Sequence, residues 1–230
     1  MQYPSPLCEG AVIRRYKRFL CDVVLPDGSE TTAHIANPGS MLTCWEPGAP
    51  CRLLKSDDPK RKLPWSVEQI QMAGAWIVVN TGRPNAIVGE ALLAGRIPSL
   101  SMYPTVRREV AYGTDSRVDF LLEGDGCAFV EVKNATMKAG DRAIFPDSVS
   151  ERATKHLREL MAVIDDRTRA VLLFHVGRTD VNAVAPADAI DPVYGRTLRE
   201  AAAAGVELLA YRAVPGAEGV VLGGAVQVEL

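Results

Sequence analysis

The stretch "SRVDFLLEGDGCAFVEVKN", residues 116–134, constrains the fold most, because it reads as two strands joined by a tight turn, with a carboxylate inside each strand. Apolar side chains alternate along both halves, as they do in half-buried strands. A slip of one residue would turn one apolar set out of the core. The two apolar faces coincide only if the loop Gly124–Gly126 pairs Glu123 with Cys127, which is therefore the register we expect.

This register places Asp119 directly opposite Glu131. Like charges at facing positions destabilise a sheet by a sizeable fraction of ~1 kcal/mol. A divalent cation would compensate them, because hard carboxylate oxygens bind such ions well. Neutralisation by Lys133 or Arg117, with no metal, is the alternative, and the hairpin alone leaves both open.

Composition is that of an ordinary soluble globular protein, with 47% hydrophobic and 23% charged residues. The 230 residues suffice for one large domain or two small ones. The first residues lack the apolar core of a signal peptide, and no run approaches ~18 apolar residues, so we expect a cytoplasmic protein without a membrane segment. Five cysteines at irregular spacing favour reduced thiols over a disulfide framework or a zinc site.

The pattern of elements changes near residues 80–85. Before it, five short β-rich runs punctuated by Gly and Pro predict a small barrel, whose closure avoids long free edges. After it, the runs predict the order α-β-β-β-α-β-α-β, an α/β sheet flanked by helices. We therefore expect two domains, residues 1–82 and residues 83–230.

Basic residues gather in two clusters within residues 1–62, although the whole chain carries a net charge of −2. Nine cations against seven anions give this part a net charge of +2, enough to attract an anionic polymer locally. Strand alternation would place Arg14, Tyr16 and Arg18 on one face. The candidate DNA contacts are Arg14, Arg15, Tyr16, Lys17, Arg18, Lys60, Arg61 and Lys62. Solvated strand edges and loops are the alternative, which charge alone favours.

The run "SERATKHLRELMAVIDD" has the periodicity of an amphipathic helix and follows the hairpin along the chain. Its first turns carry Arg152 and Lys155, which could reach a phosphate bound near the hairpin. We expect the neighbouring His156 to be an ordinary surface histidine. Candidates for the N-cap are Asp147, Ser148 and Ser150.

The spacing D-(x)11-E-x-K on adjacent strands between helices resembles the PD-(D/E)xK nuclease superfamily, although Val118 stands in place of its proline. The resemblance implies that Asp119 and Glu131 are ligands of Mg²⁺ or Mn²⁺ and that Lys133 orients or activates the attacking water. It also implies a catalytic role for Glu90, on the preceding helix. A solvent-facing helix glutamate is the alternative for Glu90.

Further stretches resemble the sugar fermentation stimulation protein A family in order along the chain, from about residue 10 to residue 212. They are "RRYKRFLCDV", "NPGSM", "KRKLPW", "VNTGRPN", "YGTDSRVDFLL", "VEVKNATM", "FPDSVSERATKHLREL", "RAVLLFHVGR" and "GVELLAY". The resemblance implies an OB-like β-barrel followed by a restriction-endonuclease-like mixed sheet flanked by helices. It also implies DNA binding without sequence specificity and a link to sugar (maltose) metabolism.

Two functions fit these observations. The first is a Mg²⁺- or Mn²⁺-dependent DNA phosphodiesterase whose barrel holds the substrate. The second is a DNA-binding transcriptional regulator that uses a catalytically silent nuclease-like scaffold. A sugar-binding protein finds no support, because Trp45, Trp65 and Trp76 form no evident stacking platform. DNA binding is common to both readings and is our prediction, with cleavage, strand preference and oligomeric state left open.

Overall fold

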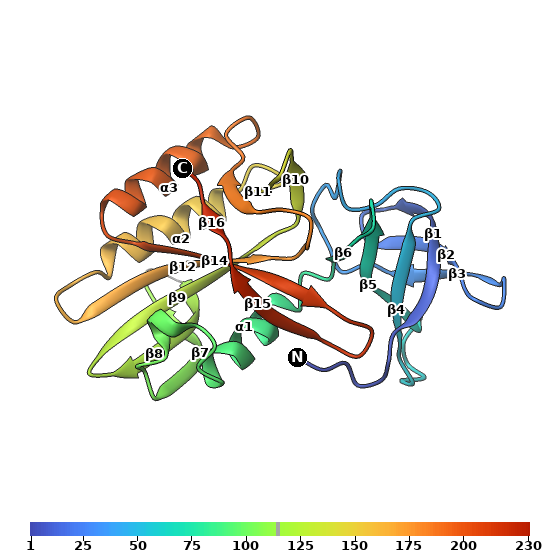
Figure 1. The fold of residues 1–230 in the computed structure, drawn as a ribbon, viewed down its shortest axis with the longest axis horizontal. Coiled ribbons are helices and arrows are strands. Elements are labelled where there is room, and N and C mark those ends of the chain that lie inside the picture. Colours follow the sequence, from blue (N-terminus) through green and yellow to red (C-terminus); the bar gives the residue numbers. More distant parts are fainter. Residues whose placement is uncertain (114–115) are drawn as a thin grey trace.

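A computed structural model describes residues 1–113 and 116–230 of the chain, and its first sheet closes into a small barrel (Figure 1). The strand order is β3-β2-β1-β4-β5-β6, and closure comes from an additional parallel pairing of β3 with β5. The strands are β1 (Cys8–Tyr16), β2 (Leu20–Val24), β3 (Glu30–His34), β4 (Pro50–Lys55), β5 (Trp65–Met72) and β6 (Ala75–Val78). Alternate side chains such as Val12, Val23 and Leu53 fill the interior. The predicted barrel is thereby confirmed.

The basic run that the sequence suggests is one strand is instead two strands joined by a tight turn. Lys17 and Arg18 both have a left-handed backbone, with φ of 46° and 65°, so the chain reverses between β1 and β2. Glycine and asparagine adopt this conformation most readily, and neither occurs here, so nothing local signals the turn. The expected alternation of faces is therefore wrong beyond Tyr16.

The second half of the chain forms a mixed sheet whose elements follow the predicted order, with one further strand at Val220–Ala225 that the sequence did not predict. Its strands are arranged β15-β14-β12-β9-β8-β7, with β12 parallel to both β9 and β14 and the remaining pairs antiparallel. The strands are β7 (Thr105–Tyr112), β8 (Ser116–Gly124), β9 (Gly126–Ala135), β12 (Thr168–Val176), β14 (Glu207–Pro215) and β15 (Val220–Ala225). The expected α/β sheet is confirmed.

Helices cover both faces of this sheet (Figure 1). They are α1 (Pro84–Leu93), α2 (Glu151–Ala162) and α3 (Pro192–Ala203), with a 3-10 turn at Pro98–Leu100. Ile87 and Val88 of α1 pack on one face, whereas Leu157 of α2 and Leu198 of α3 pack on the other. Burial of these side chains supplies the main stabilisation of the fold. In the part of the chain that the structure describes, no helix has the length and apolar character needed to span a membrane.

A third, smaller sheet lies beside the main one and was not expected from the sequence. It has the order β10-β11-β13-β16, formed by β10 (Met137–Ala139), β11 (Arg142–Phe145), β13 (Ala183–Pro186) and β16 (Gln227–Val228). Near it, Arg178 joins the barrel to the rest of the chain. Arg178 is only 2% exposed, pairs through its backbone with Ile77 of β6, and donates to the backbone carbonyl of Thr136 at 2.8 Å.

Candidate functional site

The hairpin formed by β8 and β9 has the predicted register. Glu123 faces Cys127, and the turn closes at Gly126, whose φ of +95° requires a residue without a Cβ. The backbone ladder runs to the pair Phe120–Val130. Beyond that pair, the amide of Val132 donates to a side chain instead of the backbone. Oδ2 of Asp119 accepts this hydrogen bond, which is 2.7 Å long.

Glu131 is a buried carboxylate, only 3% exposed, whose two oxygens have different surroundings. Its Oε1 accepts a hydrogen bond of 2.7 Å from Lys133 Nζ and also contacts Nδ1 of His156. Its Oε2 is equally buried but has no hydrogen-bond partner among the residues that the structure describes. Burial alone would raise the pKa of Glu131, but the hydrogen bond to His156 and the charge of Lys133 hold that pKa below its usual range. Glu131 is therefore ionised, with one oxygen unsatisfied.

The pKa of Asp119 is shifted in the opposite direction, above its usual range. Burial raises its pKa, and the negative charge of Glu131 raises it further. Hydrogen bonds from the Val132 amide and from Nδ2 of Asn85, the latter 2.6 Å long, act against this shift without reversing it. The structure thus contains two carboxylates whose mutual repulsion the surrounding residues offset only in part.

Helix α2 brings basic residues to the same place. Its N-cap is Ser150, one of the three predicted candidates, whose hydroxyl oxygen accepts a hydrogen bond from the amide of Ala153. Arg152 and Lys155 lie in the following turn, with exposed side chains. The expectation that His156 is a surface histidine is wrong, because its side chain is 4% exposed and points into the cluster.

These groups line one open pocket of about 600 Å³. Its lining consists of Asn85, Glu109, Ser116, Arg117, Asp119, Glu131, Arg152, Lys155 and His156. Predicted residues from the hairpin and from α2 therefore meet at one site, with Lys133 bound to Glu131 beside it. Sequence reasoning missed Asn85 and Glu109 altogether. Glu109 has a left-handed backbone (φ 53°) within β7, which is uncommon for a residue other than glycine in a strand.

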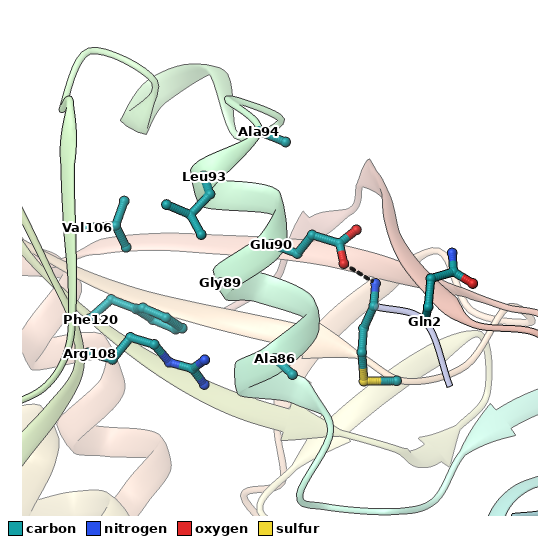
Figure 2. Close-up of a pocket in the computed structure, with 10 residues that line it drawn as sticks. Gln2, Ala86, Gly89, Glu90, Leu93, Ala94, Val106, Arg108 and Phe120 are labelled. Atoms are coloured by element: carbon teal, nitrogen blue, oxygen red, sulfur yellow. Dashed lines mark ion pairs between the residues drawn. The ribbon is translucent and has the colours of Figure 1, made fainter. Parts of the chain in front are cut away.

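Glu90 lies elsewhere, so its predicted membership of the cluster requires correction. Its carboxylate forms an ion pair of 2.6 Å with the amino group of Met1. Glu90 thus lines a different pocket, across which Arg108 lies (Figure 2). The physical reason is helical phase. Asn85 and Glu90 are five residues apart on α1, which is about 140° around the helix axis, so only Asn85 faces Asp119.

The predicted contacts in the barrel differ in how far neighbouring side chains and carbonyls engage them. Lys17, Arg18 and the cluster Lys60–Lys62 are exposed, although Arg61 donates to the Ser66 hydroxyl at 3.0 Å. The three remaining candidates are held by other parts of the barrel.

Those three are Arg14, Arg15 and Tyr16. Arg14 forms an ion pair of 2.8 Å with Asp22 and lies over the ring of Tyr16, whose hydroxyl also donates to Asp22. Arg15 donates to the backbone carbonyls of Asn37 and Gly39, so it holds the loop at "NPGS". Lys17 and Arg18, and the cluster Lys60–Lys62, are therefore the cations more available for phosphate contacts.

Two family models match the chain. The model described as the SfsA N-terminal OB domain matches residues 13–79, and the model described as the sugar fermentation stimulation protein RE domain matches residues 82–219. Together these matches span nearly the whole length of the chain.

Similar proteins extend this match. A sugar fermentation stimulation protein homolog of Geobacter sulfurreducens is 54% identical over 93% of this chain and 92% of its own length. A homolog of Geotalea uraniireducens is 50% identical over the full length of both chains. The solved structure of SfsA from Pyrococcus furiosus, in complex with Ca²⁺, has a TM-score of 0.88 at 27% identity and covers 100% of this chain and 98% of its own.

Proposed function

The chain belongs to the sugar fermentation stimulation protein family, and we propose that it binds DNA and hydrolyses phosphodiester bonds at the pocket around Asp119 and Glu131 with the help of a divalent cation. One observation carries this proposal. A buried, ionised carboxylate keeps one oxygen without a hydrogen bond, beside a second carboxylate that it repels. An unsatisfied buried charge is costly, and a bound cation would satisfy it.

The residues fit Mg²⁺ or Mn²⁺. Oxygens of Asp119 and of Glu131 are hard ligands, and Mg²⁺ keeps several waters when only one or two carboxylates hold it. Among the described residues, no group of three or more His, Cys, Asp or Glu side chains could hold a metal. A cation at this site would therefore depend on two carboxylates and on water. The Pyrococcus furiosus relative was solved with Ca²⁺, which supports a divalent-cation site in this chain as well.

Each side chain would have a separate task. A divalent cation held by Asp119 and Glu131 would neutralise charge on the phosphate and increase the acidity of a water molecule. Arg152 and Lys155 lie on the pocket wall and would bind the phosphate oxygens. Lys133 would add a positive charge beside the reacting groups.

The barrel would bind the part of the nucleic acid that lies outside the pocket. OB-like barrels bind nucleic acid through cations that follow the backbone, without reading the sequence. Lys17, Arg18, Lys60 and Lys62 are exposed cations suited to phosphate contacts. We therefore propose binding without sequence specificity. A link to sugar metabolism rests on the name of the family.

A DNA-binding regulator without catalysis is the second candidate, favoured by two features of the site. The Lys133 ammonium group is engaged by Glu131 at 2.7 Å, and Glu90 does not supply a further carboxylate. On this reading the hairpin is a retained scaffold, and DNA binding is the whole function.

Cleavage assays separate the two candidates. Purified protein would be incubated with supercoiled, linear and single-stranded DNA in Mg²⁺, Mn²⁺ or EDTA, beside the variants Asp119→Asn and Lys133→Ala. The matched control is Asp125→Asn, since Asp125 is fully exposed at the tip of the same hairpin. Cleavage that requires metal, persists in the control and is lost in both site variants supports the nuclease. Binding without cleavage in every condition supports the regulator.

A further inference from the structure

His156 is a buried histidine to which the proposed function gives no task. It lies in α2 with its side chain 4% exposed, and both ring nitrogens contact charged groups. Nδ1 contacts Glu131 Oε1 and is 3.5 Å from Lys133 Nζ. Nε2 is 3.4 Å from Nε of Arg152. The ring therefore links the helix that carries the phosphate-binding cations to the carboxylate on β9.

The partners determine which ring nitrogen carries the proton. A guanidinium group has only donors, so the Arg152 N–H must donate and Nε2 of His156 must accept. In a neutral imidazole one nitrogen donates when the other accepts. Nδ1 therefore carries the proton and donates a hydrogen bond to Glu131 Oε1. The Lys133 ammonium group, 3.5 Å from Nδ1, donates instead to the same Oε1 at 2.7 Å. The opposite tautomer would place the Nδ1 lone pair against a carboxylate oxygen at hydrogen-bonding distance, which is repulsive.

This arrangement gives the two oxygens of Glu131 different tasks. Oε1 accepts from both Lys133 and His156 and is thereby saturated within the protein. Oε2 is buried and unsatisfied in the described part of the chain. The imidazole N–H fixes the orientation of the carboxylate. Because this ring nitrogen brings no formal positive charge in this tautomer, it competes less with a bound cation for the charge of Glu131 than a second lysine would.

We propose that His156 is a positioning residue, which, protonated on Nδ1 and held so by Arg152, orients Glu131 so that Oε2 faces the divalent cation. The inference rests on the proposed function, because it requires a cation at the Asp119–Glu131 pair. The same contacts argue against a direct ligand role, since Nδ1 donates to Glu131 and the lone pair of Nε2 is directed to Arg152. Hydrogen bonds to ligating groups from such neighbouring residues typically contribute 10- to 100-fold to metal affinity.

Three substitutions test the position of the donor. In His156→Asn the side-chain amide lies where Nδ1 lies, so the hydrogen bond to Glu131 is retained. In His156→Gln the amide lies where Nε2 lies, and in His156→Ala no donor remains. Mn²⁺ binding would be measured by the electron paramagnetic resonance of the free ion, with circular dichroism to verify folding and DNA binding in EDTA as a control.

We expect His156→Asn to bind Mn²⁺ within about threefold of the wild type, and His156→Gln and His156→Ala to bind it at least about tenfold more weakly, with DNA binding in EDTA unchanged. Equal Mn²⁺ affinity in the wild type, His156→Gln and His156→Ala would overturn the role of His156 and leave the metal site intact. Weak binding by all three variants would also overturn it, because the position of the donor would then not matter. A wild type that binds no Mn²⁺ would overturn the proposed metal site and this inference together.

The tautomer has a separate test that requires no metal. The nitrogen resonances of ¹⁵N-labelled histidine distinguish a protonated ring nitrogen from an unprotonated one. The chain has three histidines, and the His156 signals are identified by their loss in His156→Asn. We expect a protonated Nδ1 and an unprotonated Nε2. A protonated Nε2 would refute the proposal, whatever the variants show.

Discussion

The substitution Asp119→Asn should make the metal-free protein more stable and the metal-loaded protein less stable than the wild type. Cβ atoms at facing strand positions are about 5 Å apart, and we take the same separation for the two charges. Two carboxylates at that distance repel by about 0.8 kcal/mol in water and by about 3 kcal/mol at an effective dielectric constant of 20. Lys133 offsets part of this repulsion. An asparagine oxygen still accepts from the Val132 amide, and rotation of the Asn85 amide lets its oxygen accept from the new NH2 group, so we expect a net gain of about 1 kcal/mol in the free energy of unfolding.

The assay is a thermal melt in EDTA and in saturating Mn²⁺. For a chain of this length, 1 kcal/mol corresponds to about 2–4 °C, so the variant should melt that much higher in EDTA. Mn²⁺ at 100 times its dissociation constant stabilises the wild type by about 2.7 kcal/mol, or about 5–10 °C. The variant loses this stabilisation, so the order of the two melting temperatures should reverse. Asp125→Asn should follow the wild type in both conditions.

The pH dependence of stability tests independently that Asp119→Asn stabilises the metal-free protein. Because the pKa of Asp119 is raised by folding, its ionisation opposes the fold, and its contribution to stability falls as pH rises from the ordinary aspartate range through the raised pKa. The advantage of Asp119→Asn in EDTA should therefore be small near pH 4 and should grow toward pH 7. A variant that melts below the wild type in EDTA at pH 7, or that gains as much from Mn²⁺, would refute the reasoning.

Three further predictions follow from single features of the structure. Glu109→Gly should raise the free energy of unfolding by roughly 0.5–1 kcal/mol in urea titration, because glycine adopts the left-handed backbone without strain; a loss of stability would contradict this. Arg178→Ala should cost about 1–3 kcal/mol, because it removes the buried donor to the Thr136 carbonyl and leaves Asp180, whose pKa the guanidinium helps to lower to about 2, with Lys138 alone of these two cations; an unchanged stability would contradict it. Lys17→Glu with Arg18→Glu should weaken DNA binding and reduce the slope of log affinity against log salt by about 1.8 if both contact phosphates, measured by fluorescence anisotropy; an unchanged slope would place the contacts elsewhere.

Local rules were enough to predict the hairpin that holds the carboxylates. Alternation of apolar residues fixed the faces of both strands, and the glycines of the turn fixed the register, so the facing of Asp119 and Glu131 followed from elementary geometry. The N-cap at Ser150 was within reach of the same kind of rule, because a hydroxyl preceding a helical run satisfies a free amide. In these cases the determining interaction lies within a few residues along the chain or across one turn.

The missed features depend on packing between distant segments. Helical periodicity places Asn85 and Glu90 on one helix but does not say which face meets the hairpin, because α1 is apolar on much of its surface. His156 looks like a surface residue in its own helix, and its burial comes from packing against other elements, among them β9, which supplies Glu131. The turn at Lys17 and Arg18 has no local signal, since its left-handed backbone is imposed by the pairing of β1 with β2.

The hydrogen bonds around the two carboxylates suggest why the site tolerates their repulsion. The amide of Val132 and the Asn85 side chain anchor Asp119, while Lys133 and His156 anchor Glu131. Each anchor comes from a residue fixed by the sheet or by a packed helix, so neither carboxylate can turn away from the other at little cost. The folded protein therefore bears the cost of this repulsion, and a cation bound by both carboxylates would remove it.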